Sequence, residues 1–144
     1  MRGKRLVRVA VMGLVVLVGM LGPLRAEVGQ AAVPSSDSYR EVSAADLKAM
    51  LDRKDFFFVN VHIPYEGEIA RTDAFIPFDK VEEQLHLLPP KKEAKIVLYC
   101  MSGRMSDIAA NTLVRQGYTN VSHLEGGMLA WEKAGYPLLK GPGR

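Results

Sequence analysis

Short apolar runs alternate with helical patterns along most of this sequence, and this alternation limits the folds open to it. The runs FFFVNV at 56–61 and KIVLYC at 95–100 are apolar, β-rich and of the length expected for buried strands. A helical pattern over 44–54 precedes the first run, and another over 106–116, with apolar residues on one face, follows the second. Strands and helices that alternate at this spacing predict an α/β domain with a mainly parallel sheet.

Weaker signals continue the same order of elements. Short strands are expected at 39–42 and 120–127, and further helical segments at 80–88 and 128–135. The stretch 62–79 holds two prolines and mixed charge, which predicts a loop with a little extended structure. We therefore expect a three-layer domain over 39–139, in which helices flank a small, mainly parallel central sheet, and a C-terminal tail at 140–144.

The N-terminus has the order of charge and hydropathy that is typical of a secretory signal. MRGKRLVR precedes the apolar run VAVMGLVVLVGML, and the helix-breaking pair Gly22-Pro23 follows. The run is shorter than the roughly 20 residues of a membrane-spanning helix. We expect a signal peptide over 1–26, cleaved after Ala26 with Ala31 or Ala32 as alternative sites, or an uncleaved N-terminal anchor. A polar linker over 27–38 follows. Either form predicts an exported domain, periplasmic or secreted, with membrane contact only through an uncleaved segment.

The distribution of charge argues against a nucleic-acid partner. The full chain holds 19 basic and 16 acidic residues, which gives a formal net charge of +3. Five of the basic residues and no acid lie in 1–26, so 14 basic and 16 acidic residues remain for the rest. No basic patch interleaved with aromatic residues is left there, and no nucleic-acid partner is expected.

Cys100 is the only cysteine of the chain, so it has no partner for an intrachain disulfide. A buried, inert thiol at the end of a core strand is one account of it. The alternative is a reactive thiol, because ligands of parallel sheets bind beyond the carboxyl ends of the strands. The first-turn amides and the dipole of the helix that follows would stabilise a thiolate there. Gly103 lets the loop curl into an anion nest, Arg104 adds a cation, and Ser106 is a good N-cap that could also donate to a bound anion.

The stretch from YCMSGRMSDIAANTLVRQ to GYTNVSHLEGGMLAWEKAGYPL resembles the rhodanese, or sulfurtransferase, domain family. The matching features are the strand-end Cys100, Gly103 three residues later, Ser106 at the start of the helix, and the spacing of LEGG, AW and AGYP. The resemblance extends over roughly 39–139. Phosphatases and arsenate reductases on the same fold carry an arginine six positions after the cysteine, where this chain has Ser106, so that reading is disfavoured.

The resemblance implies transfer of a sulfane sulfur from a donor such as thiosulfate, a polysulfide or a persulfide to cyanide or a thiol. It implies that Cys100 is the nucleophile and carries the sulfur as a persulfide, without a metal or organic cofactor. The loop residues expected to cradle that persulfide or bind the donor are Met101, Ser102, Gly103, Arg104, Met105 and Ser106. A redox or sulfur-relay protein is a further expected partner. The alternative is a rhodanese-like persulfide carrier or protein-interaction module without turnover.

The first half of the domain departs from the family pattern. Asn60 and His62 stand where the family commonly has an acidic residue and an arginine, and Met101 and Met105 replace arginine or small polar residues in the loop. A rim with one arginine and two thioethers predicts weak activity with the thiosulfate dianion and a preference for a persulfide, polysulfide or thiol-linked donor.

His62 is a candidate for the pocket, either as a proton-handling group or as part of its wall, although a lone histidine after a strand is more often simply hydrogen-bonded. His86 and His123 carry no functional argument from sequence. Glu66 and Glu68 fit a cation or amine site, or a solvated loop.

Three sulfur atoms are expected near the loop. Cys100, Met101 and Met105 together are soft ligands of the kind that hold Cu(I), whereas packing methionines are the plainer account and no metal site is expected.

Overall fold

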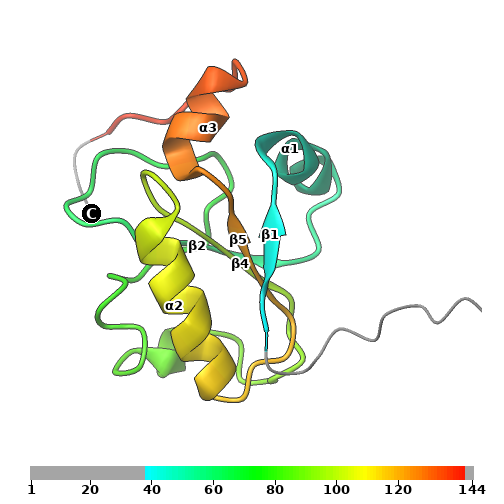
Figure 1. The fold of residues 1–144 in the computed structure, drawn as a ribbon, viewed down its shortest axis with the longest axis vertical. Coiled ribbons are helices and arrows are strands. Elements are labelled where there is room, and N and C mark those ends of the chain that lie inside the picture. Colours follow the sequence, from blue (N-terminus) through cyan, green and yellow to red (C-terminus); the bar gives the residue numbers. More distant parts are fainter. Residues whose placement is uncertain (1–37, 142–144) are drawn as a thin grey trace, which may run out of the picture. The chain divides into compact units, whose positions relative to one another are not determined.

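The computed structural model describes residues 38–141, which form a five-stranded sheet with helices on both faces (Figure 1). The sheet order is β1-β5-β4-β2-β3, and every neighbouring pair is parallel. The elements, in chain order, are β1 (Arg40–Val42), α1 (Ala44–Asp52), β2 (Phe57–Asn60), β3 (Ala74–Phe75), η1 (Leu85–Leu87), β4 (Ile96–Tyr99), α2 (Arg104–Arg115), β5 (Val121–Leu124) and α3 (Gly127–Lys133). The expected α/β class with a mainly parallel sheet is confirmed.

Two apolar clusters, one on each face of the sheet, define the three layers. On one face Ala109, Ala110 and Leu113 of α2 pack against side chains such as Val59 and Leu98. On the other face α1 and α3 cover Phe58, Val97 and Tyr99 through buried residues that include Leu47, Met128 and Trp131. Successive residues of β2 and β4 thus point into opposite clusters, as the two-residue period of a strand requires. The three-layer arrangement agrees with the sequence-based expectation.

The helix boundaries follow from local signals. The Ser43 hydroxyl caps α1 by accepting a hydrogen bond from the Asp46 amide at 3.1 Å. Gly117 lies just after the end of α2 with φ of 88°, the left-handed conformation that commonly ends a helix at glycine. Both residues are local signals that the sequence itself contains: Ser43 with Asp46 three residues later resembles a capping box, and Gly117 stands where a C-terminal glycine is expected.

The helix expected over 80–88 is wrong. The chain forms turns over 78–84 and a single three-residue 3₁₀ turn, η1. Val81 and Leu88 are its buried apolar residues, while Leu87 is 46% exposed. Because the segment has too little apolar surface to hold a full helix against the sheet, and Pro89 follows directly, regular helix is not stabilised. The predicted loop 62–79, in turn, contains the two-residue edge strand β3.

The predicted signal or anchor over 1–26 and nearly all of the linker over 27–38 lie outside the described residues, as do the last three residues of the tail. Across 38–141, no helix combines the length and the apolar character that spanning a membrane requires.

Candidate active site

The cysteine loop lies at the carboxyl edge of the central sheet. Cys100 directly follows β4, and α2 begins four residues later at Arg104. The neighbouring strand β2 ends in register, because the Val61 amide donates to the Tyr99 carbonyl at 2.9 Å. The structure therefore places the thiol where parallel sheets place their ligands, between the end of a central strand and the beginning of a helix.

The thiol of Cys100 is enclosed and partnered. The residue is 1% exposed, and its Sγ accepts a hydrogen bond from the Gly103 amide at 3.1 Å. Sγ also lies 3.6 Å from the hydroxyl oxygen of Ser106. The first hydrogen bond within α2 runs from the Asp107 amide to the Gly103 carbonyl, so the amides of 104–106 precede the helical ladder. This arrangement is suited to holding a negatively charged sulfur.

Gly103 allows this geometry. Its φ is 96°, a left-handed conformation that glycine adopts without steric cost. It is the N-cap of α2, so the helix begins at Arg104 and the assignment of Ser106 as N-cap is wrong. Ser106 is instead the third residue of the helix and is fully buried.

The Gly-Gly turn before α3 forms the seat of the cysteine loop. The Met128 amide donates to the Cys100 carbonyl at 2.8 Å, and the Leu129 amide donates to the Met101 carbonyl at 3.0 Å. Gly127, with φ of 59°, lies so close that an added Cβ would overlap the Cys100 carbonyl oxygen and approach that of Met101 to 2.6 Å. This close backbone contact thus requires glycine at the last position of the LEGG segment. The contact holds in place the loop that carries the thiol.

The other loop residues divide between solvent and core. Ser102 and Arg104 are exposed, so Arg104 is the cation that the loop presents to solvent. Met101 and Met105 are half-buried and pack against the two opposite core clusters. Packing therefore accounts for both methionines, as the plainer sequence-based account has it. Residues 38–141 contain no group of three or more His, Cys, Asp or Glu that could hold a metal ion.

His123 is a buried neighbour of the loop that sequence reasoning missed. It lies on β5, is 4% exposed, and its Nδ1 is 3.0 Å from the Ser106 hydroxyl oxygen. A histidine within a strand that is buried on both faces must find a polar partner, because an unpaired buried imidazole is costly. The need for a polar partner could be inferred from the sequence. The identity of that partner could not, because it depends on how α2 packs on β5.

His62 and Asn60 form a clamp on the loop after β2. The Asn60 side chain is buried, donates to the Gly67 carbonyl at 3.0 Å and accepts from the His62 amide at 3.0 Å. The His62 Nε2 lies 2.5 Å from a carboxylate oxygen of Glu66. Within the part of the chain that is described, His62 makes no hydrogen bond to the cysteine loop. Glu68 is buried at 9% exposure, so the expectation of a solvated loop is wrong for this residue.

The Asn60 side chain uses its amide nitrogen as a donor and its amide oxygen as an acceptor, and this gives a stability prediction. Asn60→Asp should lower the free energy of unfolding by about 1–3 kcal/mol, because a carboxylate oxygen would face the Gly67 carbonyl in place of the amide donor. Asn120→Asp is the control, since the Asn120 side chain accepts from Arg40 and a carboxylate keeps that role. Urea denaturation at neutral pH measures both. Equal stabilities of the two variants would contradict the assigned role of the Asn60 amide.

Tyr99 supports the base of the loop from the other face. Its hydroxyl accepts a hydrogen bond from the Ile69 amide at 3.0 Å and lies 2.8 Å from the Thr72 hydroxyl. Burial raises the pKa of Tyr99 well above its usual value, so the phenol is neutral. The residue before Cys100 is therefore a fixed structural anchor.

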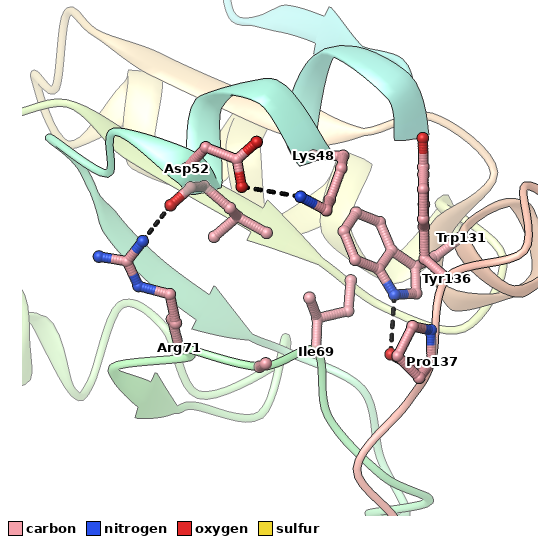
Figure 2. A pocket seen from close by; sticks show the side chains of 9 residues that line it. Lys48, Asp52, Ile69, Arg71, Trp131, Tyr136 and Pro137 are labelled. Atoms are coloured by element: carbon pink, nitrogen blue, oxygen red, sulfur yellow. Dashed lines mark hydrogen bonds and ion pairs between the residues drawn. The ribbon is translucent and has the colours of Figure 1, made fainter.

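A cavity of about 230 Å³ lies on the face of the sheet that α1 and α3 cover, and none of its lining residues belongs to the cysteine loop (Figure 2). Four of its polar side chains, those of Lys48, Asp52, Arg71 and Trp131, are paired with one another or with backbone. The Trp131 indole donates to the Pro137 carbonyl at 3.0 Å, Lys48 pairs with Asp52 at 2.7 Å, and Arg71 donates to the Leu51 carbonyl. The cavity is thus separate from the cysteine loop, and several of its polar side chains already have a partner in its own wall.

The fold and the cysteine loop define a class of protein. Residues 43–134 match the family model of the rhodanese-like domain, and this chain belongs to that family. A sulfurtransferase from Allochromatium vinosum is 34% identical over 105 residues, which cover 69% of this chain and 94% of that protein. A tRNA uridine(34) hydroxylase from Erwinia tasmaniensis is also 34% identical over 105 residues, but the match spans 30% of that longer protein and 69% of this chain.

The structural comparison agrees. The crystal structure of a rhodanese-related protein from Thermoplasma volcanium superimposes with a TM-score of 0.60 at 30% sequence identity. The match covers 70% of this chain and 98% of that one. The resemblance read from the cysteine loop and the LEGG segment is confirmed at the level of the family.

Proposed function

We propose that this protein is a sulfurtransferase that moves a sulfane sulfur from a donor to a thiophilic acceptor through a persulfide on Cys100. The observation that carries the proposal is the position of Sγ, which accepts the Gly103 amide at 3.1 Å beside the first turn of α2. The similarity to a sulfurtransferase over 94% of that protein supports it.

The proposed reaction has two displacements. The Cys100 thiolate attacks the outer sulfur of the donor, a new S–S bond forms, and the donor residue leaves with the electron pair of the bond that breaks. A thiol or cyanide then attacks the outer sulfur of the persulfide, and Cys100 leaves as thiolate. The Gly103 amide and the first-turn amides of α2 stabilise the anionic sulfur in both steps.

Intact-mass spectrometry tests the proposal. After incubation with an organic persulfide or with polysulfide, the protein should gain the mass of one sulfur, peptide mapping should place it on Cys100, and cyanide should remove it as thiocyanate. If no sulfur is retained from any of thiosulfate, polysulfide and persulfide, the proposal fails.

The enclosure of the thiol favours one second candidate, a persulfide carrier or docking module without turnover. Cys100 is 1% exposed, which limits access for the acceptor of the second step. A persulfide that forms but is not discharged by cyanide or small thiols would identify this function, and discharge by a redox or sulfur-relay protein alone would name the class of partner. Hydrolysis of an aryl phosphate would identify the phosphatase chemistry that Ser106, in place of arginine, argues against.

The loop composition gives a prediction about the donor. Thiosulfate carries two negative charges and would meet one exposed arginine, Arg104, and the half-buried methionines of the rim. We expect kcat/KM for thiosulfate to be at least about tenfold lower than for an organic persulfide, which corresponds to about 1.4 kcal/mol of transition-state stabilisation. Steady-state formation of thiocyanate or of the product persulfide measures both. Comparable values for the two donors would contradict the prediction.

We propose further that the domain acts after export. The support comes from residues 1–26, in which a basic opening precedes the apolar run 9–21 and Gly22-Pro23 follows that run. N-terminal sequencing of the protein from a periplasmic or extracellular fraction checks this, with a mature chain beginning at Glu27 as the expected result for a cleaved signal. Recovery in the cytoplasm with an intact N-terminus would reject it.

A further inference from the structure

The buried histidine next to the cysteine loop has a contact on each ring nitrogen. His123 Nδ1 lies 3.0 Å from the Ser106 hydroxyl oxygen, which in turn lies 3.6 Å from Cys100 Sγ. Among residues 38–141, His123 Nε2 has no hydrogen-bond partner, and it lies 3.7 Å from a carboxylate oxygen of Glu41. The Glu41 side chain is 63% exposed. A chain of polar atoms therefore connects the enclosed thiol to a carboxylate at the surface.

The Ser106 hydroxyl is the centre of this chain. It has one proton and two lone pairs, and it contacts Sγ, Nδ1 and the Gly103 carbonyl, which lies at 3.0 Å. The hydroxyl can therefore donate in one direction while it accepts in another. When it accepts from the thiol and donates to Nδ1, it lies directly on a path for a proton between Cys100 and His123.

The charged and titratable groups that face His123 come from residues 39–41 and from α2. From β1, the Glu41 carboxylate faces Nε2, and the Tyr39 ring packs edge-on with ring centroids 5.3 Å apart. The Tyr39 hydroxyl donates to Asp107 of α2, and this bond raises the pKa of Tyr39, so the phenol remains neutral. The register partner of His123 on β4 is the apolar Leu98. The charged group that faces the ring in these contacts is thus the Glu41 carboxylate.

We propose that His123 is a positioning residue that accepts the thiol proton of Cys100 through Ser106 and returns it after sulfur transfer. In the forward step the S–H bond breaks as a new bond to Oγ forms, and the original O–H proton moves to Nδ1. The electron pair stays on Sγ, giving a thiolate and an imidazolium whose Nε2–H faces Glu41. The reverse shift follows when Cys100 leaves the persulfide as thiolate. The inference rests on the proposed role of Cys100 as sulfur carrier.

The test is the pH dependence of Cys100 alkylation by iodoacetamide, measured on the full chain. His123→Gln should move the midpoint of the profile up by about one pH unit and so lower the alkylation rate about tenfold below the midpoint. The rates should converge at high pH, where the thiolate forms without the histidine. Ser106→Ala should give the same shift, and the double variant should add little to either single one, because both changes break the same path. Glu41→Gln should shift the midpoint in the same direction by less, since this carboxylate is largely exposed.

His86→Gln is the matched control, because His86 is exposed on η1, and its profile should superimpose on that of the wild type. A merely structural role of His123 would lower the melting temperature and leave the midpoint in place. Superposition of the wild-type profile and that of any folded variant at His123 or Ser106 would overturn the inference. If neither folds, an unchanged midpoint for Glu41→Gln would overturn it.

Alkylation needs no sulfur donor, so it separates this inference from the proposed function. A wild-type protein that shows the histidine-dependent profile but retains no sulfur would reject the sulfurtransferase and leave the proton path. The opposite outcome is equal sulfur loading on Cys100 with and without His123 and Ser106, together with unshifted alkylation profiles. That outcome would reject the proton path and leave the sulfurtransferase.

Discussion

Cys100→Ser is expected to abolish persulfide formation and to lower turnover by about three orders of magnitude or more, because a hydroxyl at this position is neither a sulfur carrier nor an effective nucleophile. The fold should be retained, since serine is nearly isosteric and its oxygen can still accept from the Gly103 amide. The free energy of unfolding should change by about 1 kcal/mol. Intact mass after donor incubation, turnover and urea denaturation measure the three quantities.

Ser102→Ala is the matched control for this result. Ser102 lies in the same loop, is exposed, and makes no hydrogen bond through its side chain within the structure that is described. The cradle expected for the persulfide is made of backbone amides, and alanine keeps the amide of residue 102 while it removes the exposed hydroxyl. The variant should therefore load sulfur and turn over as the wild type does. Turnover that survives in Cys100→Ser would show that another group carries the reaction.

The second large effect is expected at Gly127. Gly127→Ala should destabilise the domain and displace the cysteine loop, because the new Cβ would overlap the Cys100 carbonyl and lie 2.6 Å from that of Met101. Alanine at a φ of 59° costs about 1–2 kcal/mol by itself, and the overlap should add about 1–3 kcal/mol. Urea denaturation measures the loss of stability, and the sulfur-loading rate measures the displacement.

Gly117→Ala separates the two contributions. Gly117 also has a positive φ, 88°, but an added Cβ there would meet no atom of the described residues within 4 Å. This variant should show only the conformational cost and should load sulfur at the wild-type rate. If Gly127→Ala is no more destabilising than Gly117→Ala, close contact between the Gly-Gly turn and the Cys100 and Met101 carbonyls does not hold the cysteine loop in place.

The central part of the fold could be predicted because the strongest signals in the sequence are local. The runs that became β2 and β4 are apolar on both faces, and only strands covered by helices on both sides satisfy such a pattern. The helix expected over 80–88 depended on Asp79 as a possible cap and on Pro89-Pro90 as the end of the helix. Neither signal reports whether the segment has enough apolar surface to pack. The same limit explains β3, whose two residues are strand only because β2 offers them an edge.

The candidate site was predictable to the extent that it is made of consecutive residues. Cys100 and Gly103 could be placed because a strand, a glycine loop and a helix follow one another directly in the chain. His123 could not, because its contact with Ser106 joins residues that are 17 positions apart and depends on how α2 packs on β5. The clamp made by Asn60 was hidden for a different reason, since its partner is a backbone carbonyl and leaves no trace in the side-chain pattern.

The depth of Cys100 has a consequence for which sulfur a nucleophile can reach. With the residue 1% exposed, the inner sulfur of a persulfide would be enclosed by the loop, and the outer sulfur would extend the side chain by one atom. Attack on the outer sulfur passes it to the acceptor. Attack on the inner sulfur would instead release sulfide and leave the acceptor joined to the protein as a mixed disulfide. In the proposed reaction, enclosure would therefore determine which sulfur is attacked: it would favour transfer of the outer sulfur over a reaction that releases sulfide and blocks the site.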